Sequence, residues 1–345
     1  MDLKDFSYFL PEDLVAQQPY PQRDHSRMMI LHRDGGEIND CAFFQLTDFL
    51  QENDVLVVNN SKVIPARLFG KKPTGAALEI LLLTKKEDAA TSPVWEALIR
   101  PAKRLRENDV VILNSDCEAK VLARISEKKW LLRFFCSGKF EDYLEKHGRA
   151  PLPPYIKRNR NTGRLVEDLE RYQTVYAQTP GSIAAPTAGL HFSAEVLQAL
   201  QAKGIRIAPI TLHVGYGTFL PIAVTRVEDH AMEPEYFEID MQTADIINNA
   251  RRVIAVGTTS TRTLESVADE TGLIKAQSGF TSLFIYPGRK FRRVNGLLTN
   301  FHLPRSSLFL LVCAFAGTDV IKKAYQHAVA HRYLFYSYGD CMLII

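Results

Sequence analysis

Residues 181–192 read GSIAAPTAGLHF and residues 211–219 read TLHVGYGTF, and the rest of the chain can be interpreted outward from these two blocks. Between them, SAEVLQALQAKG predicts a helix with Ser193 as N-cap and Gly204 just beyond its end, and IRIAPITLHV predicts a strand. This order of turn, helix and strand is typical of an α/β protein. Small residues beside a histidine suit a binding pocket, because they let backbone N–H groups approach a ligand closely. They are equally ordinary in tight turns, so both interpretations stay open for the two blocks alone.

The composition is that of a globular protein. The 345 residues are 46% hydrophobic and 23% charged, enough for roughly two domains with a substantial core. The net charge of +3 is too small to indicate a polyanionic partner by itself. Five cysteines without a C-x-x-C pair favour a reducing cytoplasm over a disulfide framework or a zinc site. The N-terminus lacks a signal-peptide pattern, and the longest apolar run, residues 308–316, is about half the length that spans a bilayer.

Strand and helix patterns divide the chain into three segments. Helices and strands alternate at residues 1–61, with a short helix expected after Phe9, and again at residues 151–345, where SLFIYPG (282–288) is expected to be a strand. Residues 62–150 have mainly short strand patterns separated by turn residues, with one helix at FEDYLEKHG. We therefore predict an α/β domain in two parts, with an inserted antiparallel β-barrel domain between them.

Polar residues gather where predicted strands end, while the commonest catalytic motifs are missing. The sequence has no P-loop, strand-bound G-x-G-x-x-G, H-E-x-x-H, G-x-S-x-G or kinase motifs. VVNNSKVIPARL places Asn59 and Lys62 after a strand. VIAVGTTSTRTLE places Thr258 and Thr259 at a helix start, where free N–H groups attract a carboxylate or phosphate, and Arg262 follows one turn later. Each segment alone is also consistent with an ordinary cap or turn.

Further candidates are three polar segments and three basic clusters. The polar segments are LLTNFHLPRSSL, SYGDCMLI and DHAMEPEYFEI. The basic clusters are RPAKRLR, KRNRNTGR and GRKFRR, with Tyr155, Tyr172 and Phe291 nearby for stacking. A single cluster is more often a solvated face. Three in a nearly neutral chain are consistent with a folded RNA, whose phosphates bind Lys and Arg and whose exposed bases stack on aromatic rings.

Together, the motifs resemble one family, the S-adenosylmethionine:tRNA ribosyltransferase-isomerases of queuosine biosynthesis. The resemblance covers nearly the full length. The motifs that carry it, in family order, are LPEDLVAQQPYPQRDHSRMMIL, VVNNSKVIPARL, RYQTVYA, GSIAAPTAGLHF, LHVGYGTF, GTTSTRTLE, SLFIYPG, LLTNFHLPRSSLFLLVCAFAG and YSYGDCMLI. The chain departs from the family pattern at Glu233, where a histidine is usual. Arg289, Asn295 and Cys341 likewise stand where Tyr, Asp and Ala are common.

The resemblance implies a fold and a reaction. The fold class is α/β, with a barrel-like α/β catalytic domain and an inserted all-β small barrel domain. The reaction moves the ribosyl moiety of S-adenosylmethionine onto 7-aminomethyl-7-deazaguanine at the tRNA wobble position. It gives epoxyqueuosine and releases adenine and methionine. S-adenosylmethionine is a co-substrate, no metal is expected, and the partner is the anticodon arm of tRNA. We expect a cytoplasmic monomer without a membrane partner.

This chemistry assigns candidate roles to residues in the matching motifs. The reaction needs three proton transfers. A proton leaves the ribosyl C5′, a proton is added to the departing adenine, and the attacking amine loses a proton. Each transfer requires a group with a pKa near neutrality. The candidate catalytic residues are His191, His213, His302, Glu235 and Asp340. The candidate substrate-binding residues are Arg23, Asp24, Arg27, Asn59, Lys62, Thr187, Gly215, Gly217, Thr258, Thr259, Arg262, Asn300 and Tyr338. The candidate tRNA-binding residues are Lys157, Arg158, Arg160, Arg164, Arg292 and Arg293.

Two other functions are compatible with parts of the sequence. A non-catalytic RNA-binding module would explain the basic clusters and the inserted barrel, but not the Gly, Thr and His blocks. A hydrolase that uses Ser182 or Ser260 with a histidine would explain those blocks, although neither serine lies in a nucleophile-elbow sequence.

Overall fold

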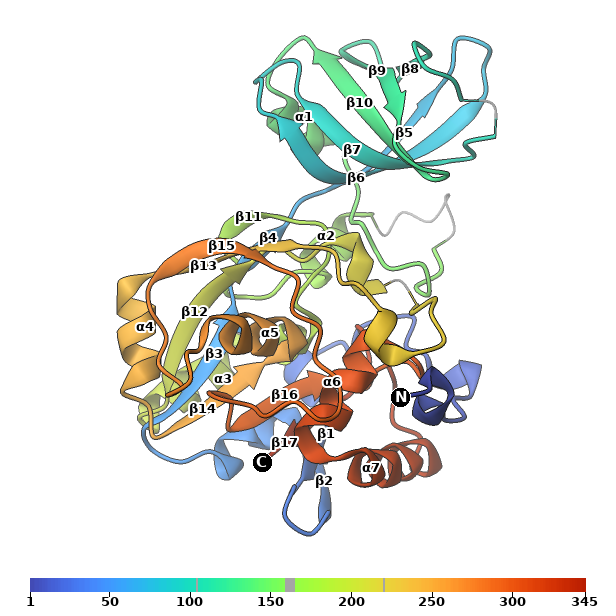
Figure 1. The fold of residues 1–345 in the computed structure, drawn as a ribbon. Coiled ribbons are helices and arrows are strands. Elements are labelled where there is room, and N and C mark those ends of the chain that lie inside the picture. The colour runs from blue at the N-terminus through green and yellow to red at the C-terminus, as the bar shows by residue number, and fades with distance from the viewer. Residues whose placement is uncertain (104, 159–164, 220) are drawn as a thin grey trace. The chain divides into compact units, whose positions relative to one another are not determined.

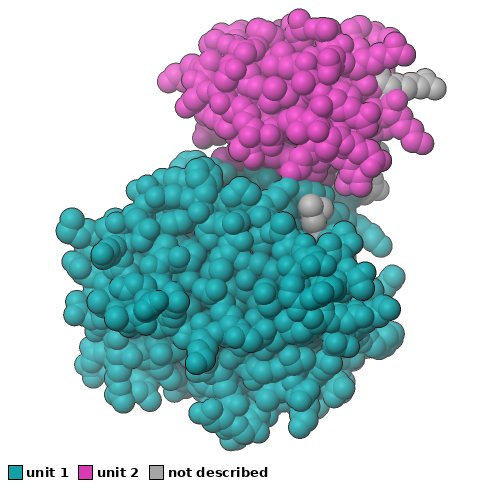
Figure 2. All heavy atoms as spheres, in the orientation of Figure 1, with its two compact units in different colours: residues 1–62, 153–159, 171–345 teal, residues 63–152, 160–170 magenta. Residues whose placement is uncertain are grey.

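The structure is a computed structural model that describes the chain except for residues 104, 159–164 and 220. The chain divides into two compact units (Figure 2). Unit 1 comprises residues 1–62, 153–159 and 171–345, and unit 2 comprises residues 63–152 and 160–170. The predicted fold class is confirmed, because one unit is α/β and the other contains a closed antiparallel β-barrel. The domain boundaries expected from the sequence stay a prediction.

Unit 1 is built on a nine-stranded mixed sheet with the order β15-β13-β12-β3-β14-β16-β17-β1-β2 (Figure 1). The strands are β1 (Arg27–Leu31), β2 (Ile38–Ala42), β3 (Asp54–Asn59), β12 (Arg206–Leu212), β13 (Glu235–Ile239), β14 (Arg252–Val256), β15 (Gln277–Thr281), β16 (Gly296–Asn300) and β17 (Cys341–Ile344). Strands β12, β3, β14 and β16 are parallel, and β17 is antiparallel to β16. The carboxyl ends of four strands therefore meet at one edge, together with the start of β17.

Both faces of the central strands of this sheet are buried. Along β3, Val55 and Val57 belong to one hydrophobic cluster, whereas Leu56 and Val58 belong to another. The first cluster includes residues of α4 (Met241–Asn248), α5 (Gly257–Val267), α6 (Ser307–Ala316) and α7 (Thr318–Ala330). The second includes residues of α3 (Ala194–Ala202) and the 3-10 helix Phe43–Phe49. Because side chains alternate across a strand, unit 1 has three layers with the sheet in the middle.

The remaining short elements belong to neither the nine-stranded sheet nor the helices that cover it. Strand β4 (Ser61–Val63) pairs with β11 (Thr179–Ser182), and α2 spans Leu165–Arg171. The other 3-10 helices are Leu3–Phe6, Glu12–Leu14, Arg23–His25, Thr187–His191, Tyr216–Phe219 and Val227–Asp229. Within the described ranges, no helix is both long enough and apolar enough to cross a membrane.

Unit 2 contains a closed barrel with the strand order β10-β7-β6-β5-β8-β9. The strands are β5 (Arg67–Lys71), β6 (Ala77–Glu87), β7 (Val94–Arg100), β8 (Val110–Ile112), β9 (Cys117–Arg124) and β10 (Lys129–Cys136). Helix α1 (Phe140–His147) contributes Phe140, whose ring lies 4.4 Å from that of Phe134 between centroids. Cys117 and Cys136 pair in register across β9 and β10 and form a disulfide. The sequence did not predict this bond. The two cysteines are 19 residues apart, and only the register of β9 with β10 places them opposite each other.

Two local predictions were wrong. Residues 282–288 do not form a strand, and the regular strand β15 ends just before them. The carbonyl of Leu283 accepts from the Arg262 Nε–H at 3.0 Å and Leu283 N donates to Thr281 Oγ1, so local and side-chain contacts take up these backbone groups. The helix expected after Phe9 is only the single 3-10 turn Glu12–Leu14.

Candidate active site

A pocket with about 820 Å³ of empty space lies at the sheet edge where the carboxyl ends of the parallel strands meet. Ligands of α/β proteins commonly bind outside the carboxyl ends of parallel strands. Val214 follows β12, Gly257 follows β14 and His302 follows β16, and all three line the pocket. The block at 181–192 contributes Ala185 to Ala188. Strand topology thus brings together motifs that are far apart in the sequence.

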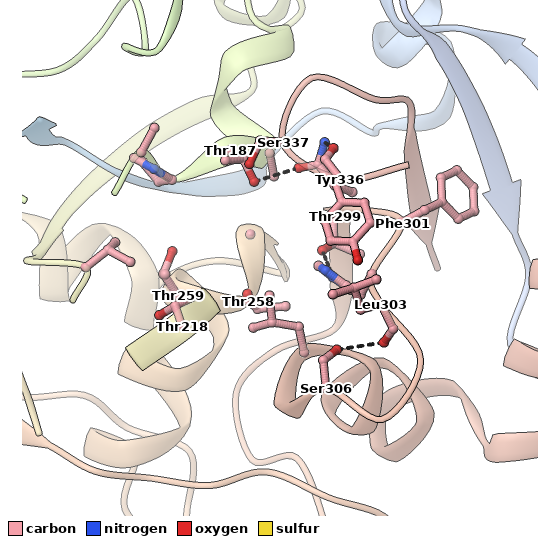
Figure 3. Close-up of a pocket in the computed structure, with 18 of the residues that line it drawn as sticks. Thr187, Thr218, Thr258, Thr259, Thr299, Phe301, Leu303, Ser306, Tyr336 and Ser337 are labelled. Carbon is pink, nitrogen blue, oxygen red and sulfur yellow. Dashed lines mark hydrogen bonds between the residues drawn. The ribbon is translucent and has the colours of Figure 1, made fainter. Parts of the chain in front are cut away.

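The pocket is lined mainly by apolar atoms, and most of its polar groups are hydroxyls. Figure 3 shows Thr218, Thr258 and Thr259 close together in the view, opposite Thr299 and Tyr336. Of the residues expected from the sequence, those that line the pocket are Thr187, Thr258, Thr259, Asn300 and His302. Polar lining residues that were not among the expected substrate-binding or catalytic residues are Tyr155, Thr218, Thr299, Arg305, Ser306, Tyr336 and Ser337. Most of these residues lie beside expected site residues in the same motifs, and this proximity was the signal in the sequence that could have identified them. The described residues include no group of three or more His, Cys, Asp or Glu side chains placed to hold a metal ion.

The first turn of α5 opens into this pocket without a side-chain cap. The N-cap residue Val256 offers no oxygen to the free N–H groups. The hydroxyl of Thr261 is unavailable, because it donates back to the carbonyl of Gly257 at 3.1 Å. The Thr259 hydroxyl is buried and has no hydrogen-bond partner within the described chain. The helix dipole, the free N–H groups and this hydroxyl together favour an anionic group of a ligand.

His191 reaches the pocket only through a chain of hydrogen bonds. Its Nδ1 lies 2.7 Å from Ser26 Oγ, and its Nε2 lies 3.0 Å from Asn300 Nδ2. On the pocket side, Thr187 Oγ1 donates to Asn300 Oδ1 at 3.0 Å. The imidazole is 4% exposed and stacks on Phe43. His191 therefore supports the pocket through Asn300.

The neighbouring acceptors fix the tautomer of His191. Asn300 Nδ2 also donates to the carbonyl oxygens of Tyr336 (3.1 Å) and Asp340 (3.4 Å), which can only accept. The amide nitrogen of Asn300 must then face His191, so Nε2 of the ring accepts and Nδ1 carries the proton. Burial, with a smaller contribution from the Arg23 guanidinium, lowers the pKa of His191 to about 3. His191 is thus neutral with both nitrogens engaged, unlike the acid–base group expected from the sequence.

His302 lines the pocket directly. Its Nε2 lies 2.8 Å from Thr299 Oγ1, and its backbone N–H donates to the hydroxyl of Tyr325 at 3.0 Å. Its Nδ1 makes no hydrogen bond to any residue that the structure describes. Burial lowers the pKa of His302 to about 3, so this ring is also neutral at physiological pH. Of the three expected histidines, His302 alone lines this pocket.

His213 lies away from the pocket lining. Its ring stacks on Tyr236 with centroids 5.6 Å apart, and its buried Nδ1 has no hydrogen-bond partner among the described residues. Burial lowers its pKa, against a smaller opposing effect of the Glu238 carboxylate. His191 and His213 share no hydrogen-bonding or stacking partner, so the structure does not bring them together as one acid–base pair.

Gly181→Ala is expected to lower the free energy of unfolding by about 1–3 kcal/mol. Gly181 has a φ of +146°, and a Cβ there would lie 2.7–2.9 Å from ring atoms of His213. Urea unfolding measures the loss, and Gly138→Ala is the control, because a Cβ at Gly138 meets nothing within 4 Å. A loss below about 0.5 kcal/mol would contradict the tight contact between Gly181 and His213.

A buried ion pair supports one wall of the pocket. Arg262 Nη1 lies 2.5 Å from Glu235 Oε2, and both side chains are almost fully buried. Glu235 Oε1 accepts from the N–H of Gly215 at 2.8 Å and from the hydroxyl of Thr218 at 3.3 Å. Thr218 lines the pocket, whereas Glu235 and Arg262 do not. The pair therefore positions the 215–218 loop. Gly217 lies beside Glu233, because a Cβ at Gly217 would be 3.0 Å from Glu233 Oε2.

Two expected site residues brace the sheet edge instead of lining the pocket. The Asp340 carboxylate is fully buried and accepts from Arg27 N (2.8 Å), Leu334 N (2.7 Å) and the Tyr20 hydroxyl (2.9 Å). Burial raises the pKa of Asp340, and these three donors oppose the shift. Asn59 Oδ1 accepts from two backbone N–H groups, those of Ser61 and Leu212. Both side chains hold strand ends in place.

The remaining substrate-binding candidates also lie outside the main pocket lining. Asp24 accepts from the hydroxyl of Ser193, the N-cap of α3, at 2.7 Å. The Arg27 guanidinium lies 3.7 Å from the ring centroid of Tyr333. Lys62 is exposed. Arg23 and Tyr338 line a second, smaller cavity.

The expected tRNA-binding residues differ in how free their charges are. Arg292 and Arg293 donate their backbone N–H groups to the buried carboxylate of Glu265, and both guanidinium groups donate to backbone carbonyls. These two arginines therefore stabilise a loop. Lys157 is exposed, and Arg158 donates to the carbonyl of Gln17 at 2.7 Å. Arg160 and Arg164 lie outside the described residues.

Comparison with known proteins gives one consistent result. A family model described as queuosine biosynthesis protein matches residues 3–344. The chain is 53% identical to the S-adenosylmethionine:tRNA ribosyltransferase-isomerase of Syntrophus aciditrophicus and 49% identical to that of Desulfitobacterium hafniense, over the full length of each protein. It also matches the crystal structure of the S-adenosylmethionine tRNA ribosyltransferase from Thermotoga maritima. That match has 33% identity and a TM-score of 0.54, and covers 99% of this chain and 100% of the other.

Proposed function

This chain belongs to the queuosine biosynthesis family of S-adenosylmethionine:tRNA ribosyltransferase-isomerases, and on this basis we propose that the pocket beside α5 is its active site. The enzyme moves the ribosyl moiety of S-adenosylmethionine onto 7-aminomethyl-7-deazaguanine at the wobble position of tRNA. The product is epoxyqueuosine, and adenine and methionine are released. We further propose that it acts as a monomer in the cytoplasm, on the anticodon arm.

The observation that carries the assignment of the pocket is the uncapped start of α5. The hydroxyl of Thr259, which is buried and has no hydrogen-bond partner among the described residues, and the free N–H groups of the first turn line the pocket. The methionine carboxylate of S-adenosylmethionine is an anion of the right kind for this position. Thr258 lies beside Thr259 in the pocket lining. Arg262 does not line the pocket and contributes only through its ion pair with Glu235.

The rest of the pocket provides groups for the sugar and for proton movement. S-adenosylmethionine supplies the ribosyl group, and its sulfonium acidifies the neighbouring C–H bonds. His302 is the pocket histidine whose Nδ1 makes no hydrogen bond among the described residues, so it is our candidate base; with a pKa of about 3 in the free protein it accepts a proton only weakly, below the near-neutral value that favours such transfers. Asn300, oriented by His191, and Thr187 offer polar atoms to sugar hydroxyls. Ser337, whose Oγ lies 2.6 Å from the hydroxyl of Tyr155, borders the same space.

The test of this function is RNA-dependent release of adenine. The protein is incubated with S-adenosylmethionine and with tRNA that carries the modified wobble base, and adenine is measured by chromatography. Release only with the modified tRNA is expected. No release, beside an active relative as control, would favour the RNA-binding module. Release without RNA would favour a hydrolase, although Ser182 Oγ donates to Ser61 Oγ and Ser260 Oγ donates to a backbone carbonyl.

Thr259→Val is expected to raise the KM for S-adenosylmethionine about tenfold or more, because hydrogen bonds to charged groups contribute about 1.5–3 kcal/mol. Valine keeps the shape of threonine and removes only the hydroxyl. Thr263→Val is the matched control, because its hydroxyl donates within α5 to the carbonyl of Thr259. The two KM values are measured by adenine release. An equal KM in wild type and Thr259→Val would remove this hydroxyl from the binding site.

A further inference from the structure

The main pocket has one charged side chain in its lining. Of the lining residues that the structure describes, Arg305 alone carries a full charge, because none is Asp, Glu or Lys and His302 is neutral. Arg305 is exposed to solvent, whereas Thr258 and Thr259 at the start of α5 are buried. The guanidinium group therefore belongs to the part of the lining that solvent reaches, at the entrance of the pocket, and the start of α5 is more enclosed.

The charge of Arg305 is not neutralised within the chain. Its guanidinium group makes no hydrogen bond and no ion pair with any residue that the structure describes. Arg262, by contrast, is buried and paired with Glu235. Because the Arg305 guanidinium is solvated, its charge costs little in the free protein and stays available to a ligand. With no carboxylate in the described lining, this cation gives the entrance of the pocket a preference for anions.

The backbone holds Arg305 in a conformation that is unusual for its residue type. Its φ is +56°, in the left-handed region that is unfavourable for residues other than glycine. Backbone and hydroxyl contacts fix this turn: Arg305 N donates to the carbonyl of Phe6 at 3.0 Å, and Ser306 Oγ donates to the carbonyl of Leu303 at 2.8 Å. None of these contacts uses the guanidinium group. Such conformations persist where the surrounding structure imposes them, and they are common at ligand sites.

We propose that Arg305 binds a backbone phosphate of the tRNA beside the nucleotide whose base enters the pocket, a role that rests on the proposed function. The reacting base is attached to a chain of phosphates that stays outside, so an exposed cation at the entrance is placed to meet one of them. Guanidinium groups bind phosphate oxygens through paired hydrogen bonds, and arginine is suited to this geometry. A phosphate contact of this kind fixes the position of the RNA without reading its sequence. The methionine carboxylate, the other anion of the reaction, has its own enclosed site at α5.

The test is a double-mutant cycle between Arg305 and single phosphates of an anticodon stem-loop RNA. Each phosphate flanking the wobble nucleotide is replaced in turn by an uncharged methylphosphonate, and binding is measured by fluorescence anisotropy. We expect one replacement to weaken wild-type binding about tenfold and to have little effect on Arg305→Gln. The salt slope of Arg305→Gln should fall by about 0.7, the value for one contact to a single strand.

Two further variants separate the phosphate contact from a general effect of charge. Arg251→Gln is the matched control, because Arg251 is exposed but does not line the pocket, and it comes before β14 whereas the pocket lies after that strand. This variant should bind every RNA as the wild type does. Arg305→Lys keeps the charge without the paired hydrogen bonds, so it is expected to retain the wild-type salt slope and to bind RNA more tightly than Arg305→Gln.

Additive effects of Arg305→Gln and every methylphosphonate would overturn the contact. A higher KM for S-adenosylmethionine in Arg305→Gln, with unchanged RNA affinity, would overturn it as well and assign Arg305 to the methionine carboxylate. The methylphosphonates also act on wild-type protein, so their lack of effect decides against the contact even if Arg305→Gln unfolds. In each of these cases, RNA-dependent release of adenine by the wild type would leave the proposed function standing. Absence of that release in the wild type, beside an active relative, would remove the proposed function itself.

Discussion

Replacing Glu235 with alanine is expected to lower the free energy of unfolding by about 3–5 kcal/mol. Glu235 and Arg262 form a buried ion pair, so the truncation leaves the Arg262 charge buried without its carboxylate partner. The backbone N–H of Gly215 and the hydroxyl of Thr218 also lose their acceptor. Urea unfolding measures the effect. Glu238→Ala is the matched control, because Glu238 is on the same strand but exposed.

The cost arises from the unpaired charge, so removal of both charges should restore stability. Glu235→Ala combined with Arg262→Met is expected to be more stable than Glu235→Ala alone, because replacing a buried pair by apolar side chains is often nearly neutral. Activity should not return in the double variant, since Gly215 and Thr218 stay unanchored. A Glu235→Ala protein as stable as Glu238→Ala would show that the pair is not buried in solution.

Local sequence patterns predicted the elements, and the topology then decided which motifs meet. The helix from Ser193 to Gly204 and the buried strand before Gly257 follow directly from capping residues and apolar runs. Convergence of Thr187, Thr258 and Asn300 on one pocket depends on β14 and β16 being parallel neighbours. A single sequence does not contain that pairing. The resemblance to a family indicated only that these motifs belong to one site.

The roles of individual polar residues were harder to predict, because partners distant in sequence set them. The motif around His191 says that a histidine is present, but Ser26 and Asn300 determine its tautomer and its burial. The motif around Glu235 indicates charge in a loop, whereas the structure pairs Glu235 with a buried Arg262. Hydrogen bonding and desolvation shift a group's role without changing its residue type.

His191→Ala is expected to reduce kcat about 10²-fold, because loss of a positioning contact can misplace reacting groups by about 1 Å. Without the Nε2 acceptor, Asn300 Nδ2 keeps only the carbonyls of Tyr336 and Asp340 as acceptors, so the amide and its Oδ1 contact with Thr187 are held less firmly. His191→Gln is expected to recover much of the rate, since its amide oxygen can accept from Asn300 and its NH2 can donate to Ser26. A catalytic base would not be rescued this way, because glutamine does not titrate.

The protonation state of His191 provides a readout that is independent of the rate. Because burial lowers its pKa from the unfolded value of 6.5 to about 3, the folded protein keeps it neutral while the unfolded chain protonates near pH 6.5. Its contribution to stability is therefore complete above pH 6.5 and is lost as the pH falls toward 3, at up to about 1.4 kcal/mol per pH unit. Unfolding free energies measured between pH 7 and pH 4 should decline less steeply in His191→Gln than in wild type. Nitrogen-15 spectra of the wild-type ring should show a protonated Nδ1 and a bare Nε2 across this range. A ring that titrates near pH 6.5, with His191→Gln as inactive as His191→Ala, would make His191 an acid–base catalyst and end its assignment as the residue that positions Asn300.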